Sequence, residues 1–460
     1  MPGLTPHAAR QPVVKFTEIL GFSMSAAEQL LSARWIIPVE PDSLVLEHHA
    51  LVMRDGRILD ILPAGAARAR YPLASVEEFP EHALIPGLIN AHTHAAMSLM
   101  RGIADDRPLM EWLTDHIWPL EQKWMGEAFV RDGSDLAMAE MIRGGITCFS
   151  DMYFFPEVTA QQAIRCGMRA MLGMILVDFP SAWASGPAEY LEKGLALRDE
   201  LLNDTLVSFA FAPHAPYSVS DEPLLRIATL AAELDLPIHM HLHETAEEIE
   251  QSRQQFGMRP INRLKQLELL GPGYIAVHMT QLTDEEIDLI AKTGASVVHC
   301  PESNLKLASG FCPVAKLVAA GVNVAIGTDG AASNNDLDVM GEMRMTALLA
   351  KAVARDASVI PAPTALRMAT LNGARALGLD AEIGSLEPGK WADITAIRLD
   401  RIETQPLFNP ISNLVYAASR HQVSDVWVGG RRLLKNRELT TLDIGDISQK
   451  ARAWREKLLT

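Results

Sequence analysis

The chain has 460 residues, and its formal net charge of −16 argues against a nucleic-acid surface, which needs clustered Lys and Arg. The length accommodates an α/β barrel with a smaller attached domain. The negative charge makes a neutral or cationic small molecule a more suitable partner than a nucleic acid. The four cysteines show no C-x-x-C spacing, so we expect neither disulfides nor a thiolate zinc site. No segment has the ~18 consecutive apolar residues of a membrane span, so we expect a cytoplasmic protein without a membrane partner.

Both ends of the chain have the texture of short β-strands. Residues 1–28 lack clear periodicity and are expected to form an N-terminal extension. The β runs that follow the extension, and those that return after residue 379, are residues 33–38, 49–53, 58–62, 384–394 and 423–434. A closing helix is expected over residues 447–459. We predict that residues 29–83 and 380–460 together form one small composite β-sandwich domain.

The middle of the chain, residues 84–379, alternates short apolar runs with longer helical stretches. This alternation is typical of βα units around a parallel sheet. Eight candidate strands can be counted, at residues 83–91, 146–152, 169–177, 206–212, 237–241, 274–278, 296–299 and 323–327. The helices between them begin with capping signals such as Thr283 followed by Glu286. The pattern predicts an α/β fold whose main part is a (β/α)₈ TIM barrel.

Histidines and acidic residues recur where these strands end. In a TIM barrel the functional residues lie at the C-terminal ends of the strands, because the loops there form the open face. The residues at these ends are His92 and His94, then His214, then His241, His243 and Glu244, then His278, and finally Asp329. The chain has 14 histidines, and chance would seldom place six of them at these ends. The pattern therefore favours a converging polar site.

Three imidazoles and one carboxylate form a ligand set that suits zinc. We predict that one Zn²⁺ is held by His92, His94, His241 and Asp329. Zinc in such a site lowers the pKa of a water toward neutrality. The sequence thus indicates metal-assisted hydrolysis.

Two further residues are expected to act on that water. Glu244, three residues after His241, is predicted to take a proton from the attacking water and pass it to the substrate. His278 is predicted to hydrogen-bond the water and to stabilise charge in the tetrahedral intermediate.

Other residues are given structural roles. His239 and His243 are expected to be barrel-core or loop histidines, and His299 to be packed and hydrogen-bonded. Met97 and Met174 are candidates for the lining of an apolar pocket.

Several motifs together resemble the amidohydrolase superfamily. They are residues 86–94 (PGLINAHTH), the strand that ends at His278, and residues 241–245 (HLHET), 303–307 (SNLKL) and 327–335 (GTDGAASNN). Within it, they look most like the 5′-methylthioadenosine/S-adenosylhomocysteine deaminases, relatives of the triazine hydrolases. The resemblance implies a distorted barrel with the composite β domain and one catalytic zinc. A bridging lysine on strand four, as in binuclear relatives, is absent, and His214 stands at that strand end.

The resemblance also implies substrate contacts. Glu121 matches the carboxylate that binds the ribose hydroxyls, and His214 matches a histidine that contacts substrate. Glu244 and Asp329 would also touch the substrate, and Trp112 would face the purine or ribose. Some family members carry arginines on strand three and in the next loop, whereas residues 173–176 here are apolar and residues 180–183 (PSAW) also lack arginine. The lack of arginines at these positions favours 5′-methylthioadenosine over S-adenosylhomocysteine as the substrate.

The expected reaction is the hydrolytic deamination of 5′-methylthioadenosine to 5′-methylthioinosine and ammonia. Glu244 would move the protons, and Asp329 would help ammonia to leave. One alternative is a related zinc amidohydrolase that acts on guanine, cytosine or a substituted triazine, including its dechlorination. A second alternative is a non-catalytic barrel scaffold. A homo-oligomer is also expected.

Overall fold

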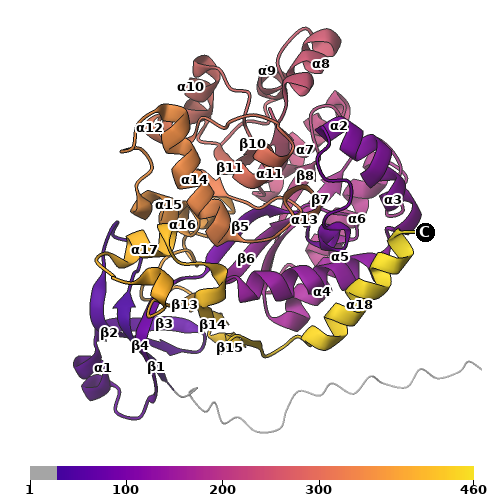
Figure 1. The fold of residues 1–460 in the computed structure, drawn as a ribbon. Coiled ribbons are helices and arrows are strands. Elements are labelled where there is room, and N and C mark those ends of the chain that lie inside the picture. The colour runs from indigo at the N-terminus through magenta and orange to yellow at the C-terminus, as the bar shows by residue number, and fades with distance from the viewer. Residues whose placement is uncertain (1–27) are drawn as a thin grey trace, which may run out of the picture.

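The computed structural model describes residues 28–460, and nearly all of the predicted extension over residues 1–28 lies outside the described residues. Eight parallel strands form a nearly closed barrel in the order β12-β11-β10-β9-β8-β7-β6-β5 (Figure 1). They are β5 (Leu88–Thr93), β6 (Ile146–Asp151), β7 (Arg169–Leu176), β8 (Val207–Pro213), β9 (Ile238–Leu242), β10 (Tyr274–His278), β11 (Ser296–His299) and β12 (Val324–Ile326). The predicted (β/α)₈ barrel is confirmed.

Helices cover the outside of the barrel and the C-terminal ends of its strands. Those between β5 and β9 are η1 (Ala95–Met100), α2 (Leu109–Trp112), the π-helical turn η2 (Leu113–Ile117), α3 (Trp118–Trp124), α4 (Glu127–Arg143), α5 (Pro156–Cys166), α6 (Pro187–Glu200) and α7 (Asp221–Leu234). Those after β9 are α8 (Ala246–Phe256), α9 (Pro260–Gln266), α10 (Asp284–Thr293), α11 (Pro301–Lys306), α12 (Val314–Ala319), α13 (Ala331–Asn334), α14 (Val339–Ala354), α15 (Ala362–Met368) and α16 (Leu371–Ala376). The capping box of Thr283 and Glu286 at the start of α10 is present as predicted.

The barrel closes between β5 and the segment that follows β12, through the side chain of Asn90 and through the backbone. Asn90 Nδ2 donates to Thr328 Oγ1 at 2.7 Å, and Asn90 Oδ1 accepts from the Thr328 N–H at 3.0 Å. The next N–H, that of Asp329, donates to the His92 carbonyl at 3.0 Å. Closure of the barrel therefore places Asp329 beside His92.

The prediction of one barrel strand over residues 83–91 is wrong in one respect, because the structure has two strands there, which meet at Gly87. Residues before the glycine belong to β4 (Ser75–Pro86) of the second sheet, and residues after it form β5. At Gly87 a Cβ atom would lie 2.0 Å from Thr147 Oγ1, so any side chain would clash with β6. The Gly87 N–H donates to the Asp393 carbonyl at 2.9 Å. The apolar run is continuous because both halves are buried, although in different sheets.

The second sheet combines the two ends of the chain, in the order β16-β15-β14-β13-β4-β1-β2-β3 (Figure 1). Its other strands are β1 (Gln29–Ile36), β2 (Leu46–Arg54), β3 (Arg57–Pro63), β13 (Ile394–Arg398), β14 (Val423–Val428), β15 (Arg431–Lys435) and β16 (Glu438–Leu439), with α1 (Ala64–Arg70) after β3. The sheet curls so that its turns meet: a Cβ on Gly56 would lie 2.6 Å from the Gly429 carbonyl oxygen. The predicted pairing of the two ends is confirmed, and the domain boundaries stay a prediction.

The last helix, α18 (Ile444–Leu458), packs against α4 and η1 of the barrel (Figure 1). Trp454 Nε1 donates to Asp132 Oδ2 on α4 at 2.9 Å, and its ring lies edge-on to Phe129. Trp454 belongs to the same buried cluster as Met97 and Trp112. The end of the chain thus supports the segment between β5 and α4. The helix α17 (Pro410–Tyr416) likewise packs against α14 and α15.

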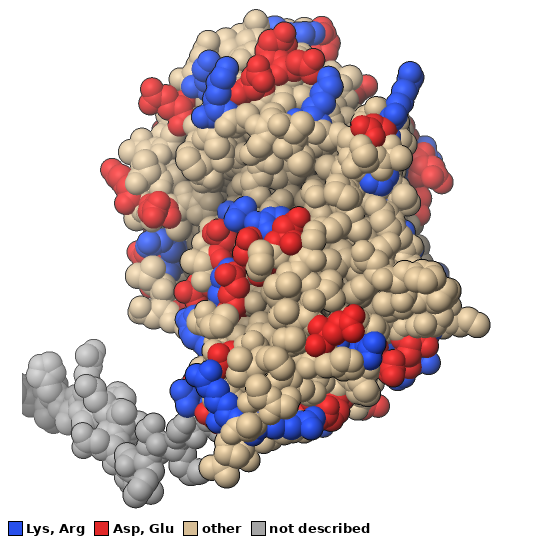
Figure 2. Space-filling view, turned by 90° about the vertical axis from the view of Figure 1, so that its left-hand side faces the viewer, with Lys and Arg blue, Asp and Glu red and all other residues tan. Residues whose placement is uncertain are grey.

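The surface carries charges of both signs. On the face shown in Figure 2, Lys and Arg side chains lie among Asp and Glu side chains and form no broad basic surface. Within residues 28–460, none of the helices combines the length and apolar character needed to cross a membrane.

Candidate active site

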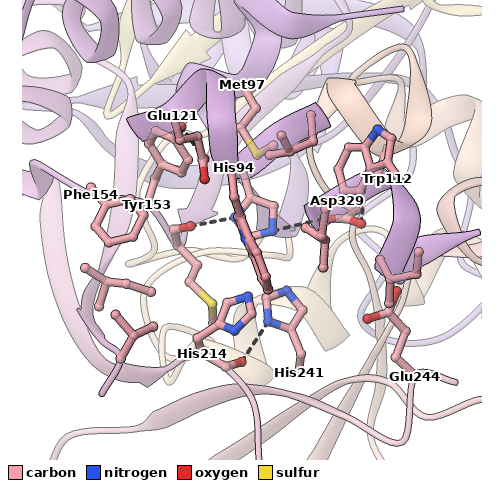
Figure 3. Close-up of a pocket in the computed structure, with 18 of the residues that line it drawn as sticks. His94, Met97, Trp112, Glu121, Tyr153, Phe154, His214, His241, Glu244 and Asp329 are labelled. Carbon is pink, nitrogen blue, oxygen red and sulfur yellow. Dashed lines mark hydrogen bonds and ion pairs between the residues drawn. The ribbon is translucent and has the colours of Figure 1, made fainter. Parts of the chain in front are cut away.

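A pocket opens at the C-terminal ends of the barrel strands, where the loops that follow them converge (Figure 3). The space between the side chains of the pocket, together with its open mouth, is about 820 Å³. Its polar lining includes His94, Glu121, His214, His241, Glu244, His278, Asp329 and Ser333. Its apolar lining includes Met97, Leu109, Trp112, Leu113, Ile117, Trp118, Phe154, Ile175, Val177 and Phe179.

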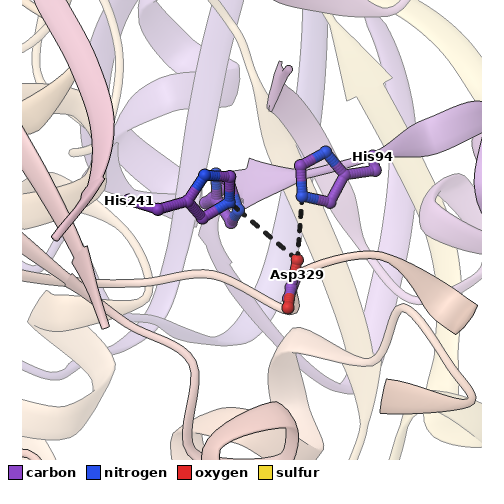
Figure 4. A group of neighbouring side chains, drawn as sticks. His94, His241 and Asp329 are labelled. Carbon is purple, nitrogen blue, oxygen red and sulfur yellow. Dashed lines mark hydrogen bonds and ion pairs between the residues drawn. The ribbon is translucent and has the colours of Figure 1, made fainter. Parts of the chain in front are cut away.

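Four side chains at the floor of the pocket could hold a metal ion: His92, His94, His241 and Asp329 (Figure 4). One potential ligand atom from each lies within 4.8 Å of the others. Asp329 Oδ1 is 3.4 Å from His92 Nε2 and 3.1 Å from His94 Nε2, and the Nε2 atoms of His92 and His241 are 3.1 Å apart. The four residues predicted from the sequence are brought together.

The other nitrogens of two of these imidazoles are held by backbone carbonyls. His94 Nδ1 donates to the Met152 carbonyl at 2.5 Å, and His241 Nδ1 donates to the His214 carbonyl at 2.8 Å. These bonds leave each Nε2 free to accept a metal ion.

Asp329 is held by three hydrogen bonds. Ser303 and Ser333 each donate to Oδ2 at 2.7 Å, and the Gly330 N–H donates to Oδ1 at 2.8 Å. Burial alone would raise the pKa of Asp329, but the neighbouring imidazoles of His92 and His94 hold that pKa well below its usual range. Asp329 is therefore a carboxylate at neutral pH.

Glu244 lies beyond the end of β9, with its carboxylate 3.8 Å from His278 Nε2. Burial raises the pKa of Glu244 above its usual value, although His278 opposes the shift. The loop is held by Glu248, whose carboxylate accepts from the N–H groups of His243 at 3.0 Å and Glu244 at 2.7 Å. His278 Nδ1 donates to Asn304 Oδ1 at 2.8 Å, so its Nε2 faces Glu244. A raised pKa and a fixed loop suit a group that both takes and gives a proton.

Glu121 and His214 line the walls. The Tyr153 hydroxyl donates to Glu121 Oε1 at 2.6 Å, and burial raises the pKa of Glu121 to about 7 despite this hydrogen bond. Burial lowers the pKa of His214 to about 3, so this imidazole is neutral, and its Nδ1 lies 3.0 Å from Ser218 Oγ. All the predicted site residues except His92 line this one pocket, and His92 lies beneath it.

Three predictions about other residues are resolved by the positions of the side chains. Met97 and Trp112 line the pocket. Met174 does not, because its side chain packs against Gly194 on α6, and its neighbour Ile175 lines the pocket. His299 is buried as expected, but its Nδ1 has no hydrogen-bond partner in the structure.

Sequence reasoning missed several residues that support the site. Tyr153, Glu248, Ser303 and Asn304 each hydrogen-bond a predicted site residue or its backbone. Ser303 and Asn304 lie in the SNLKL motif, to which no role was given, so that motif was an available signal. Tyr153 follows β6 with no comparable pattern.

Comparisons with known proteins agree with this arrangement. The amidohydrolase family model matches residues 83–433. A 5-methylthioadenosine/S-adenosylhomocysteine deaminase from Saccharophagus degradans is 52% identical over 432 residues, which are 94% of this chain and 97% of the relative. One of the same name from Teredinibacter turnerae is 53% identical over 428 residues, 93% of this chain and 97% of the relative. The crystal structure of an adenosine deaminase from Xanthomonas campestris with bound zinc has a TM-score of 0.93 and 52% identity, covering 94% of this chain and 99% of that one. The chain therefore belongs to the amidohydrolase family.

Proposed function

We propose that this protein is a zinc-dependent deaminase of adenine nucleosides that prefers 5′-methylthioadenosine. The observation that carries the proposal is a single pocket that joins the His94, His241 and Asp329 cluster to Glu244 and to an apolar wall. The names of the similar deaminases point to the same substrate class.

The proposed zinc ligands are His92, His94, His241 and Asp329. Three of the separations within this cluster are 3.1 to 3.4 Å, and all the potential ligand atoms lie within 4.8 Å of one another, so the four side chains are close enough to hold one ion together. When bound, zinc supplies a Lewis acid that lowers the pKa of a water toward 7.

Glu244 is the proposed proton carrier. Its carboxylate takes one proton from the attacking water and delivers it to a ring nitrogen of the adenine, while the water oxygen bonds to C6. The remaining proton of the attacking water, now on the oxygen bonded to C6, then passes by way of Asp329 and Glu244 to the amino group, the C6–N bond breaks, and ammonia and the 6-oxo purine are formed. His278, 3.8 Å from Glu244, hydrogen-bonds the attacking oxygen, and Asp329 accepts a proton during the departure of ammonia.

Glu121 is proposed to bind the ribose hydroxyls. Its Oε1 accepts from Tyr153, so the carboxylate is oriented before the substrate arrives and Oε2 is left for the sugar. His214, which is neutral, offers Nε2 to the nucleoside as a hydrogen-bond partner, since its Nδ1 is engaged by Ser218.

The 5′ substituent is proposed to lie against the apolar wall. No Lys or Arg is among the described residues that line the pocket, whereas Ile175, Val177 and Phe179 are. A methylthio group gains contacts from such a wall, and the amino-acid carboxylate of S-adenosylhomocysteine finds no cation. We expect kcat/KM for 5′-methylthioadenosine to exceed that for S-adenosylhomocysteine by about tenfold or more, measured as ammonia release.

A variant tests the cause of this preference. Phe179 is 44% exposed and its ring lies 6.3 Å from that of Trp118 at the mouth of the pocket. Phe179→Arg should raise the relative rate with S-adenosylhomocysteine, and Phe179→Leu, the uncharged control, should not. A native enzyme that favours S-adenosylhomocysteine would contradict the proposed preference.

The proposed function is tested by ammonia release from purine nucleosides, free bases and substituted triazines, with and without added zinc. Zinc-dependent release from adenine nucleosides is the expected result. Release from guanine, cytosine or triazines alone would support the alternative amidohydrolase, and inactivity of the zinc-loaded protein on every compound would support the scaffold. The cytoplasmic location and the homo-oligomer stay predictions.

Replacing Glu121 with glutamine should separate nucleosides from free bases. The change keeps the shape but removes the carboxylate acceptor, which in its charged form is worth about 1.5–3 kcal/mol, so KM for nucleosides measured above the Glu121 pKa of about 7 should rise about 10- to 100-fold. Any activity on free adenine should not change, because the base has no ribose. Glu111→Gln, on the neighbouring α2 and paired with Arg107 at 2.7 Å, is the matched control and should leave KM unaltered. Equal effects on base and nucleoside would argue against ribose binding by Glu121.

A further inference from the structure

The most deeply placed imidazole of the cluster, that of His92, is held differently from the other two. Its Nδ1 lies 3.0 Å from Nε2 of His239, a fully buried residue of β9. Nδ1 of His239 lies in turn 3.1 Å from Oγ of Ser150 on β6. A chain of three side chains thus runs inward from the proposed zinc site into the barrel.

The direction of each hydrogen bond follows from the role of His92. Its Nε2 faces the cluster, 3.1 Å from His241 Nε2 and 3.4 Å from Asp329 Oδ1. A nitrogen that binds zinc carries no proton, so His92 keeps its proton on Nδ1 and donates it to His239 Nε2. His239 must then keep its own proton on Nδ1 and donate to Ser150. Because both ring nitrogens of His239 have partners, His239 is not itself a ligand.

Of the three imidazoles, His92 is the one whose Nδ1 is held by another side chain. His94 and His241 donate to backbone carbonyls, which accept hydrogen bonds in every variant of the protein. His92 donates to a side chain that can be replaced. Among the three imidazoles, His92 is therefore the one whose orientation a single substitution outside the ligands can change.

We propose that His239, backed by Ser150, is a positioning residue that orients His92 for zinc and sets its tautomer. This inference rests on the zinc site of the proposed function, and it goes further by giving a role to a histidine outside the ligand set. Outer partners of metal-binding histidines commonly contribute about 10- to 100-fold to metal affinity.

The test is the zinc dissociation constant of the full chain, measured by competition with a chromophoric chelator and without substrate. His239→Leu removes the acceptor and leaves the Nδ1–H of His92 buried without a partner, so zinc should bind about 10- to 100-fold more weakly. His239→Gln can place an amide oxygen near the position of Nε2 and should recover most of the affinity. Substitution with Co²⁺ should show altered visible absorption bands in His239→Leu and native-like bands in His239→Gln.

His299→Leu is the matched control, because His299 is also a fully buried barrel histidine but has no partner at Nδ1. It should bind zinc as the native chain does. Ser150→Ala is a smaller change that keeps the test decisive if His239→Leu does not fold. It should weaken zinc binding by a smaller factor than His239→Leu does. Native zinc affinity in both His239→Leu and Ser150→Ala, or equal weakening in His299→Leu, would overturn the inference. A native chain that binds no zinc would instead refute the proposed zinc site.

Discussion

Replacing Glu244 with glutamine is expected to lower kcat for 5′-methylthioadenosine about 10³-fold while the zinc content stays native. Glutamine keeps the size of the side chain but cannot take a proton from the attacking water, and general acid–base catalysis contributes about 10²–10⁴-fold. Zinc should remain because Glu244 is outside the cluster of His92, His94, His241 and Asp329. Steady-state kinetics and metal analysis of the same preparation measure the two effects.

The control for this experiment is Glu250→Gln, an exposed glutamate on α8 that hydrogen-bonds Gln254. It should retain native kcat. A Glu244→Gln enzyme with near-native kcat would remove Glu244 from the mechanism. Loss of zinc in that variant would show that Glu244 contributes to metal binding.

Replacing His241 with alanine should abolish both zinc binding and activity. Because loss of an outer hydrogen-bond partner alone weakens metal binding about 10- to 100-fold, loss of a ligand should weaken it by at least about 100-fold. The variant also leaves Asp329 with one fewer imidazole nearby, in a buried site where an unpaired carboxylate is unfavourable. Chelator competition and ammonia release under excess zinc are the measurements.

A comparison with His421→Ala distinguishes this effect from the general cost of removing a histidine, since His421 is exposed and is not among the residues that line the pocket. That variant should bind zinc normally. Native zinc affinity in His241→Ala would show that the remaining three side chains suffice and that His241 is not a ligand.

The barrel could be predicted from the sequence because its strands are short apolar runs with clear boundaries. β10 and β11 have the predicted bounds. The prediction failed where local pattern and long-range pairing disagree. Residues 384–391, expected as strand, are mostly turns and bends, and Trp391 makes only an isolated bridge with Arg57. The division of one apolar run at Gly87 was hidden because burial makes both sides apolar.

The candidate site shows the same limit at the level of single side chains. Strand ends could be located from the sequence, so the proposed ligands at those ends could be predicted as a group. The hydrogen bond of Tyr153 with Glu121 joins two different βα units. Glu121 follows the π-helical turn η2 between α2 and α3, and no pattern in the sequence predicts that turn. On β7, a difference of one residue decided whether Met174 or Ile175 faced the pocket, because side chains alternate along a strand.

The packing of α18 on α4 affects the order in which parts of the protein can fold during synthesis. The ribosome makes the N-terminal end first, so the segment that carries Glu121 leaves it long before residues 444–458 exist. Trp454 and Leu458 share a buried cluster with Met97 and Trp112, which line the pocket. This wall of the pocket therefore gains the support of α18 only after residues 444–458 have been made.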